Sequence, residues 1–213
     1  MHRTFVAAVC ITMASCSVFP RDPEPKRVNA YLADDRDISS VRRIMVLPFW
    51  EAPGVRADLG RIHNAFHDEL TKLQRFEIVP LPPDAREDDL INSTLHRGKI
   101  STGSLVSLSE RYHLDGIMVG TVTSYRPYSP PHLGMRVQLI SIHTGDTVWA
   151  AEGLYDASDA RTVEDLEHYY QTSQATDETG HGVELYWISP SKFASYVSYR
   201  LVASWKQSLR SQT

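Results

Sequence analysis

The sequence predicts an α/β fold: a mixed sheet with parallel central strands and a C-terminal-side antiparallel hairpin, with helices on both faces. Two segments, 44–49 (IMVLPF) and 115–125 (DGIMVGTVTSY), carry apolar residues on both strand faces. Such strands are typical of a sheet covered by helices on each side. Segments with helical spacing separate these strands, and alternation of strand and helix predicts a parallel core.

The first helix is predicted from residue 55 onward, after the strand at 44–49. Its apolar residues recur at spacings of three and four, which places them in one buried stripe. They are Leu59, Ile62, Phe66, Leu70 and Leu73. Segment 76–81 (FEIVPL) then predicts a second strand, and the acidic segment 82–95 predicts a short helix.

The next helix is predicted to begin at Ser101 or Thr102 and to lead into the strand at 115–125. Two further strands, 135–142 (MRVQLISI) and 147–157 (TVWAAEGLYDA), are separated by a turn at Gly145. A glycine there supplies the positive φ that a tight hairpin turn requires. These strands form the predicted antiparallel hairpin.

Two helix starts are predicted in the last part of the chain. Thr162 and Asp165 have the spacing of a capping box, in which two side chains bond the first free backbone N–H groups. Ser189 and Pro190 have the residue types preferred at the cap and first position of a helix. The final helix is therefore expected to begin at Pro190.

The composition is that of an ordinary globular protein, with 42% hydrophobic and 23% charged residues and a formal net charge of −4. No basic stripe with interleaved aromatic residues is present in the sequence. Binding to nucleic acid depends on such a stripe, because cationic side chains must neutralise phosphates. The composition therefore disfavours a nucleic-acid partner.

The first fifteen residues have the three parts of a secretory signal peptide: a basic start at Arg3, an apolar run, and small residues at the end. The apolar run is too short to span a bilayer, which takes about twenty residues. Met13-Ala14-Ser15-Cys16 resembles the lipobox of bacterial lipoproteins, although Met13 stands where leucine is usual. The resemblance implies cleavage before Cys16 and fatty-acid (palmitate) attachment to it. Ordinary signal cleavage that leaves a free Cys16 is the alternative.

The predicted organisation is a lipoprotein signal peptide at 1–15, a lipidated Cys16 with a proline- and charge-rich tether at 16–40, and a single domain at 41–213. Fully extended, segment 17–40 reaches about 80 Å at about 3.3 Å per residue. Among such lipoproteins, Ser17 after the cysteine implies sorting to an outer membrane. The expected location is therefore the outer membrane, with the domain lipid-anchored and facing the periplasm.

The strand and helix pattern from residue 41 to 158 resembles the curli-secretion (CsgG-like) lipoproteins and their relatives. Those relatives share the amino-terminal domain fold of TolB and include lipoprotein activators of peptidoglycan synthases. The most specific matching parts are Asp115-Gly116, Gly120-Thr121 and the hairpin from Thr144 to Trp149. The resemblance implies a periplasm-facing domain that binds other envelope proteins without catalysis. It also implies an alternative, a homo-oligomeric secretion ring.

Enzymatic chemistry is the less favoured interpretation of the sequence. His63 and His67 lie four residues apart on the first predicted helix, so both imidazoles can face one metal ion. The HNAFH segment lacks the glutamate of a zinc-protease helix. A metal-dependent hydrolase that uses this pair is kept as an alternative, and we expect no catalytic residues, metal or cofactor.

The final helix has two faces that its spacing separates. Phe193, Val197, Leu201 and Trp205 form a stripe suited to packing on the sheet. The other face gathers Tyr196, Tyr199, Arg200 and Lys206, and tyrosine and arginine are typical of interface hot spots. We predict that this second face contacts a protein partner or a neighbouring subunit of the same chain. The other possibility is that the helix buries both faces.

Overall fold

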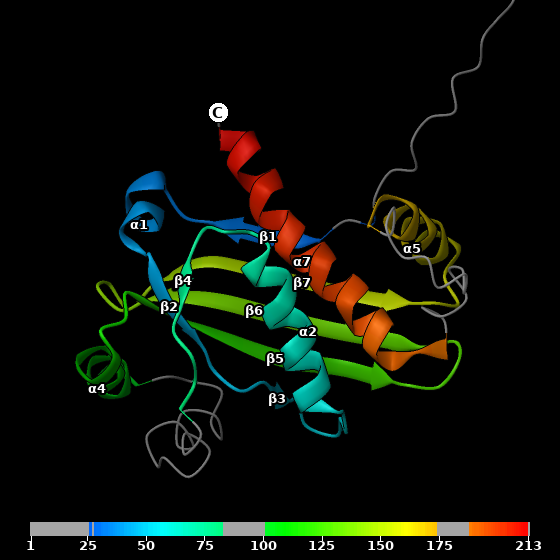
Figure 1. Ribbon diagram of the computed structural model, residues 1–213, viewed down its shortest axis with the longest axis horizontal. Coiled ribbons are helices and arrows are strands. Elements are labelled where there is room, and N and C mark those ends of the chain that lie inside the picture. Colours follow the sequence, from blue (N-terminus) through cyan, green and yellow to red (C-terminus); the bar gives the residue numbers. More distant parts are fainter. Residues whose placement is uncertain (1–25, 27, 83–100, 174–187, 213) are drawn as a thin grey trace, which may run out of the picture.

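The computed structural model describes residues 26, 28–82, 101–173 and 188–212. A single seven-stranded sheet runs through the molecule in the order β1-β7-β6-β5-β2-β4, with β3 paired to β5 (Figure 1). The strands are β1 (Asn29–Leu32), β2 (Arg43–Val46), β3 (Trp50–Glu51), β4 (Glu77–Ile78), β5 (Gly116–Arg126), β6 (His132–Ser141) and β7 (Thr147–Asp156). The helices are α1 (Asp35–Ser40), α2 (Leu59–Thr71), α4 (Thr102–Tyr112), α5 (Ala160–Ser173) and α7 (Pro190–Gln212).

The sheet is mixed, as predicted. Strand β2 pairs in parallel with β4 and β5, whereas β5, β6, β7 and β1 pair in antiparallel succession. Gly145, with φ 76°, provides the turn between β6 and β7. The predicted fold class, with parallel central strands and an antiparallel hairpin on the carboxyl-terminal side, is confirmed.

Strands β2 and β3 lie one after the other along the same side of β5. Ile44 to Val46 pair with Gly116 to Met118, and Trp50 and Glu51 pair with Thr121 and Val122. The ring of Phe49 packs between these two pairings against Gly120, where an added Cβ would lie only 2.3 Å from a ring carbon. A glycine at this position of β5 is therefore needed to admit the phenylalanine ring.

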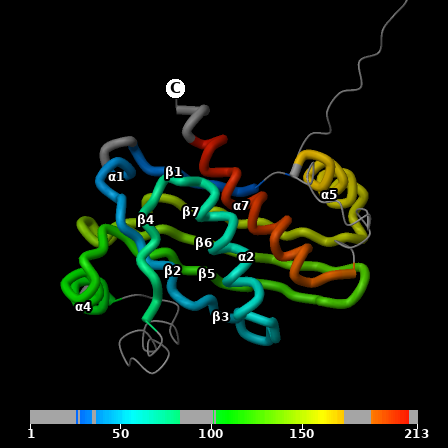
Figure 2. Tube along the Cα trace, viewed as in Figure 1, coloured from blue at the N-terminus to red at the C-terminus, as the bar shows by residue number. Residues whose placement is uncertain are grey.

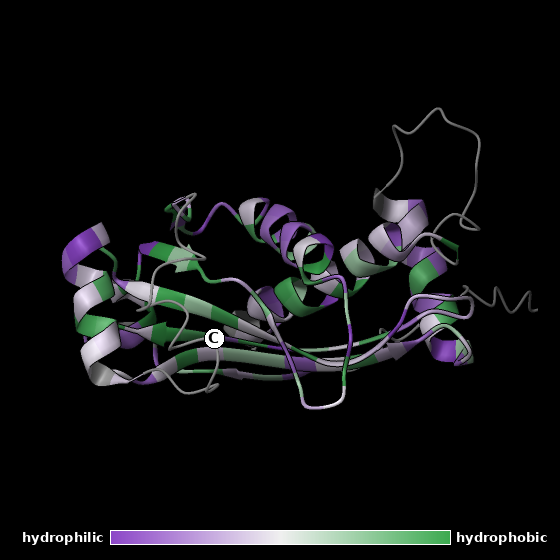
Figure 3. Cartoon of the chain, turned by 90° about the horizontal axis from the view of Figure 1, so that it is seen from below, coloured by the Kyte–Doolittle hydropathy of each residue, from purple (hydrophilic) through white to green (hydrophobic). Residues whose placement is uncertain are grey.

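Alternate residues of the central strands belong to two hydrophobic clusters, one on each face of the sheet. Ile44, Val46 and Met118 belong to the large cluster beneath α2, α5 and α7. The smaller cluster joins the other side of the same strands to α4, through Met45, Leu47, Ile117, Leu105 and Leu108. Helices on both faces are therefore confirmed. Figures 2 and 3 show α2 and α7 running together along one side of the strands.

Two helices begin where the sequence places them, whereas α2 begins at Leu59, four residues later than predicted. Ser101 accepts a hydrogen bond from the backbone N–H of Ser104 at the start of α4. The carbonyl of Ser189 accepts from Phe193 N–H, so α7 begins at Pro190 as predicted. The stripe of α2 is buried at Ile62, Phe66 and Leu70.

The capping box predicted at Thr162 and Asp165 is wrong. Asp159 begins α5 instead: its carboxylate accepts from the N–H of Arg161, and its carbonyl accepts from the N–H of Val163. Thr162 and Asp165 then lie inside the helix and are buried, with exposed fractions of 0% and 4%. The Thr162 hydroxyl contacts Lys26, and Asp165 contacts α7, which helix spacing alone does not reveal.

The chain joins the sheet before residue 41, although the sequence predicts a tether as far as residue 40. Asn29–Leu32 form β1 and pair with Trp149 to Glu152 of β7. Asp35–Ser40 form α1, so both elements belong to the folded domain. The predicted second strand is also shorter, limited to Glu77–Ile78.

Several predictions fall on residues outside the described ranges. They are the signal peptide at 1–15, Cys16, and most of the acidic helix predicted at 82–95. Within the described part of the chain, no helix is both long enough and apolar enough to cross a membrane.

Candidate functional site

The structure divides the four residues of the predicted interaction face into two pairs. Tyr196 and Arg200 are buried, with exposed fractions of 0% and 8%. Tyr199 is half-buried and Lys206 is exposed. A partner of the folded domain can therefore reach Tyr199 and Lys206, whereas Tyr196 and Arg200 contact the rest of the domain.

Asp165 of α5 contacts both buried residues of this face. Its Oδ2 atom accepts a hydrogen bond of 2.7 Å from the Tyr196 hydroxyl and lies 3.0 Å from Nε of Arg200. Burial raises the pKa of the Tyr196 hydroxyl, and the adjacent carboxylate of Asp165 raises it further. Helices α5 and α7 are thus joined by a buried, charged contact.

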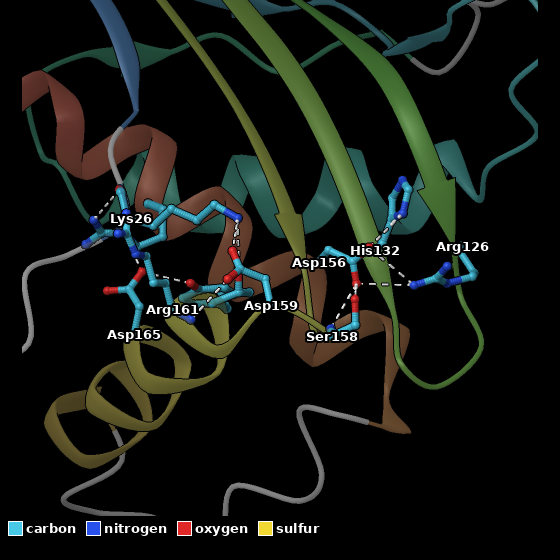
Figure 4. A network of polar contacts seen from close by, with 11 residues as sticks. Lys26, Arg126, His132, Asp156, Ser158, Asp159, Arg161 and Asp165 are labelled. Atoms are coloured by element: carbon cyan, nitrogen blue, oxygen red, sulfur yellow. Dashed lines mark hydrogen bonds and ion pairs between the residues drawn. The ribbon is translucent and has the colours of Figure 1, made fainter.

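Arg200 also contacts Lys26, which precedes β1. The carbonyl of Lys26 accepts a 3.1 Å hydrogen bond from Nη2 of Arg200. Its ammonium Nζ lies 2.9 Å from both the carboxylate of Asp159 and the hydroxyl of Thr162 (Figure 4). The hydrogen bond from Lys26 lowers the pKa of Asp159, because it favours the ionised form. We call these five residues, Lys26, Asp159, Thr162, Asp165 and Arg200, the Lys26 cluster.

Tyr199 and Lys206 line a groove of about 420 Å³ beside α7, which we call the α2–α7 groove. The remaining lining residues come from α2, the residue pair that follows it, α5 and α7. They are Glu69, Lys72, Leu73, Tyr169, Val202 and Ala203. The rings of Tyr169 and Tyr199 lie against each other, with centroids 4.7 Å apart. The groove therefore has an aromatic wall supplied by two helices.

The charges around the groove do not cancel. Glu69 is only 6% exposed and lies 2.6 Å from Nζ of Lys72, so these two charges are paired. Lys206 is exposed and forms no ion pair within the described ranges. Among the described residues, one positive charge of the groove lining is thus left without a counter-charge, and an anionic group of a partner could supply it.

A second polar network lies at the β5–β6 end of the sheet, on the face opposite α2 and α7. Ser124 Oγ hydrogen-bonds to Nε2 of His132, and Nδ1 of His132 lies 3.5 Å from Oδ2 of Asp156. Ser124, His132 and Asp156 thus follow one another as the nucleophile, the general base and the orienting carboxylate do in a catalytic serine triad.

The other contacts of Asp156 favour a structural role for this network. Its Oδ1 atom accepts from both the hydroxyl and the backbone N–H of Ser158, and Arg126 Nη2 lies 3.2 Å away (Figure 4). The Ser158 hydrogen bonds lower the pKa of Asp156. Arg126 also donates to the carbonyl of Pro130. The carboxylate thus ties the ends of three strands to the turn, and 3.5 Å is too long for a hydrogen bond to His132.

His63 and His67 lie on α2 with ring centroids 6.4 Å apart, and the ring of His63 packs edge-on against Phe49. Within the described ranges, no group of three His, Cys, Asp or Glu side chains is arranged to hold a metal ion. That no metal binds this pair stays a prediction.

Sequence reasoning did not identify Tyr169, Glu69 or Lys72 as part of the candidate site. Spacing along one helix shows which residues share a face, but it does not show which helices lie side by side. The three residues join Tyr199 and Lys206 only through the packing of α2 and α5 on α7. No local pattern in the sequence indicates that these three residues lie beside Tyr199 and Lys206.

No family model matches the chain, and no curated protein matches it. The chain is similar to a PelC dodecamer structure from Paraburkholderia phytofirmans, at 13% identity over 65% of this chain and 89% of that one, with a TM-score of 0.40. It is also similar to the LpoB C-terminal domain from Salmonella enterica (9% identity, 54% and 82% covered, TM-score 0.42). A third similar structure is lipoprotein GNA1162 from Neisseria meningitidis (16% identity, 64% and 99% covered, TM-score 0.39).

Proposed function

We propose that the protein is a lipid-anchored envelope lipoprotein that binds another envelope protein through the α2–α7 groove. The observation that carries the proposal is the combination of the Tyr169–Tyr199 wall with the lining residue Lys206, whose charge has no ion-pair partner among the described residues. Aromatic and cationic side chains around a partly buried hollow are typical of binding hot spots. The role of the domain is association with a partner, not catalysis.

The anchor follows from the first residues of the sequence. A basic start, an apolar run and Met13-Ala14-Ser15-Cys16 support export and acylation of Cys16. Several acyl chains, each contributing about 0.8 kcal/mol per buried methylene, hold a protein on a bilayer essentially permanently. Ser17 supports placement in the outer membrane, with the domain in the periplasm.

The anchor is tested by replacing the cysteine. The full chain is expressed in a bacterial host and grown with a fatty-acid label. We expect the unaltered chain to be labelled and to sediment with membranes, and Cys16→Ser to lose both properties. A Cys10→Ser variant is the matched control, because Cys10 lies in the predicted signal peptide. Membrane sedimentation of Cys16→Ser equal to that of the control would contradict the anchor.

Binding is tested by placing a photo-crosslinking residue at Gln207, an exposed position beside Lys206 on α7. The control carries the same residue at Val106, which is 46% exposed on α4. We expect a discrete crosslinked complex with one identified envelope protein from position 207 and not from position 106. Equal crosslinking from both positions, or none from 207, would overturn the proposal.

A further inference from the structure

We infer that the occupant of the α2–α7 groove is an acidic segment of a membrane-embedded protein, located close to the bilayer that holds the lipid anchor. This inference rests on the proposed function and adds to it the location and chemistry of the partner. It comes from three observations: the position of Lys26, the elements that hold it, and the charge of the groove.

The Lys26 cluster shortens the tether. The predicted tether runs to residue 40, but Lys26 is already fixed to α5 and α7 by its ammonium and its carbonyl. Only ten residue steps then separate Lys26 from Cys16. At about 3.3 Å per residue, these steps span about 33 Å when fully extended. A lipidated Cys16 therefore keeps Lys26 within about 33 Å of the membrane surface, in place of the longer reach expected from the sequence.

The residues that hold Lys26 are direct neighbours of groove residues. Arg200, which donates to the Lys26 carbonyl, follows Tyr199 on α7. Asp165, which pairs with Arg200, lies one helical turn before Tyr169 on α5. The point where the tether enters the domain and the aromatic wall of the groove thus share the same two helices. Holding Lys26 near the membrane holds this wall near the membrane as well.

The charge of the groove selects the chemistry of the partner. Glu69 and Lys72 neutralise each other, while Lys206 has no acidic partner within the described ranges. An acidic side chain of the occupant supplies the missing counter-charge, and its apolar neighbours can pack on Leu73, Val202 and the tyrosine rings. A basic segment would bring like charges together and is disfavoured by the same reasoning.

The test lengthens the tether of the full, lipidated chain. Twenty Gly/Ser residues are inserted after Pro20, and the photo-crosslinking residue is placed at Gln207 as before. The length-matched control keeps the nine residues between Cys16 and Lys26, leaves Ser17 in place and scrambles 18–25. Effective concentration falls roughly as the −3/2 power of linker length, so tripling the tether should reduce the crosslinked complex about fivefold. The scrambled control should crosslink as the unaltered chain does.

The crosslinked peptide identifies the partner, and Lys206 variants test its charge. We expect the peptide to map to an acidic segment next to a transmembrane span, Lys206→Glu to lose the complex, and Lys206→Arg to keep it. Crosslinking unchanged by the longer tether would overturn the inference, as would a soluble partner, a second copy of this chain, or lipid as the crosslinked species. No protein complex with either tether contradicts the proposed function itself, whereas an undiminished complex with the longer tether contradicts only this inference.

Discussion

Asp165 and Arg200 form a buried ion pair between α5 and α7, with Oδ2 of Asp165 3.0 Å from Nε of Arg200. Both residues have further partners, because Tyr196 donates to Asp165 and Arg200 donates to the carbonyl of Lys26. Removing one member of such a pair leaves the other charge buried and uncompensated. The pair therefore connects the packing of the two groove helices to the position where the tether enters the domain.

The first prediction concerns this ion pair. Arg200→Ala should lower the free energy of unfolding by about 3–5 kcal/mol, because it leaves the Asp165 carboxylate buried without its cation. Arg161→Ala removes the same charge from an exposed position on α5 and should change it by less than about 0.5 kcal/mol. Urea denaturation of both variants measures the difference. Equal midpoints would show that the ion pair does not stabilise the domain.

The second prediction concerns alkaline pH. Burial raises the pKa of Tyr155 from 10.0 to about 12, although the positive charge of Arg200 opposes the shift. The folded state therefore holds this proton more tightly than the unfolded chain does. The resulting stability is fully present below pH 10 and is lost as the pH rises from 10 to about 12. Two pKa units correspond to at most about 2.7 kcal/mol.

Tyr155→Phe provides the check on this prediction. The variant lacks the titrating hydroxyl, so its free energy of unfolding should fall less steeply above about pH 10 than that of the unaltered chain. Part of the slope should remain, because burial also raises the pKa of Tyr196. Denaturation curves at a series of alkaline pH values measure both slopes. Identical slopes would contradict the assignment to Tyr155.

The third prediction is that Ser124 is not a nucleophile. The Asp156 carboxylate is engaged by Ser158 and Arg126 and lies 3.5 Å from His132, so it does not position the imidazole as a general base requires. A fluorophosphonate probe should add no mass to the intact chain above the level seen with Ser124→Ala. Stoichiometric labelling that Ser124→Ala abolishes would establish a catalytic serine in this network.

Local sequence patterns predicted most of the fold because they reflect local physics. The stripe of α2, the caps at Ser101 and Ser189, and the glycine turn at Gly145 each depend on residues within a few positions of one another. Strand β1 was missed because it is short, lies at the sheet edge, where only Leu32 of its four residues is partly covered, and directly follows a proline- and charge-rich stretch. Its place is set by pairing with β7, more than a hundred residues later.

The candidate site was predicted only in part, because it also depends on contacts between residues that are far apart in the sequence. Tyr196, Tyr199, Arg200 and Lys206 share one side of α7, but the neighbouring helix decides which of them reach solvent. Tyr196 and Arg200 instead contact Asp165 inside the domain. Asp165 lies 31 residues before Tyr196 and 35 residues before Arg200 in the chain. Spacing on a single helix identifies a face, whereas burial of that face is settled by tertiary packing.

The final prediction addresses the central claim, that the α2–α7 groove binds the partner. Ala203→Trp should fill the groove while leaving its charged residues in place, because Ala203 is a lining residue with a small side chain. Val106→Trp makes a comparable change at an exposed position on α4 and serves as the control. The most direct measurement is the amount of crosslinked partner from Gln207 in each variant, with the thermal midpoint measured in parallel. We expect Ala203→Trp to lose the partner at least about tenfold, equivalent to about 1.4 kcal/mol of binding free energy, at an unchanged midpoint. Retention of the partner by a folded Ala203→Trp at the level of Val106→Trp would contradict the claim.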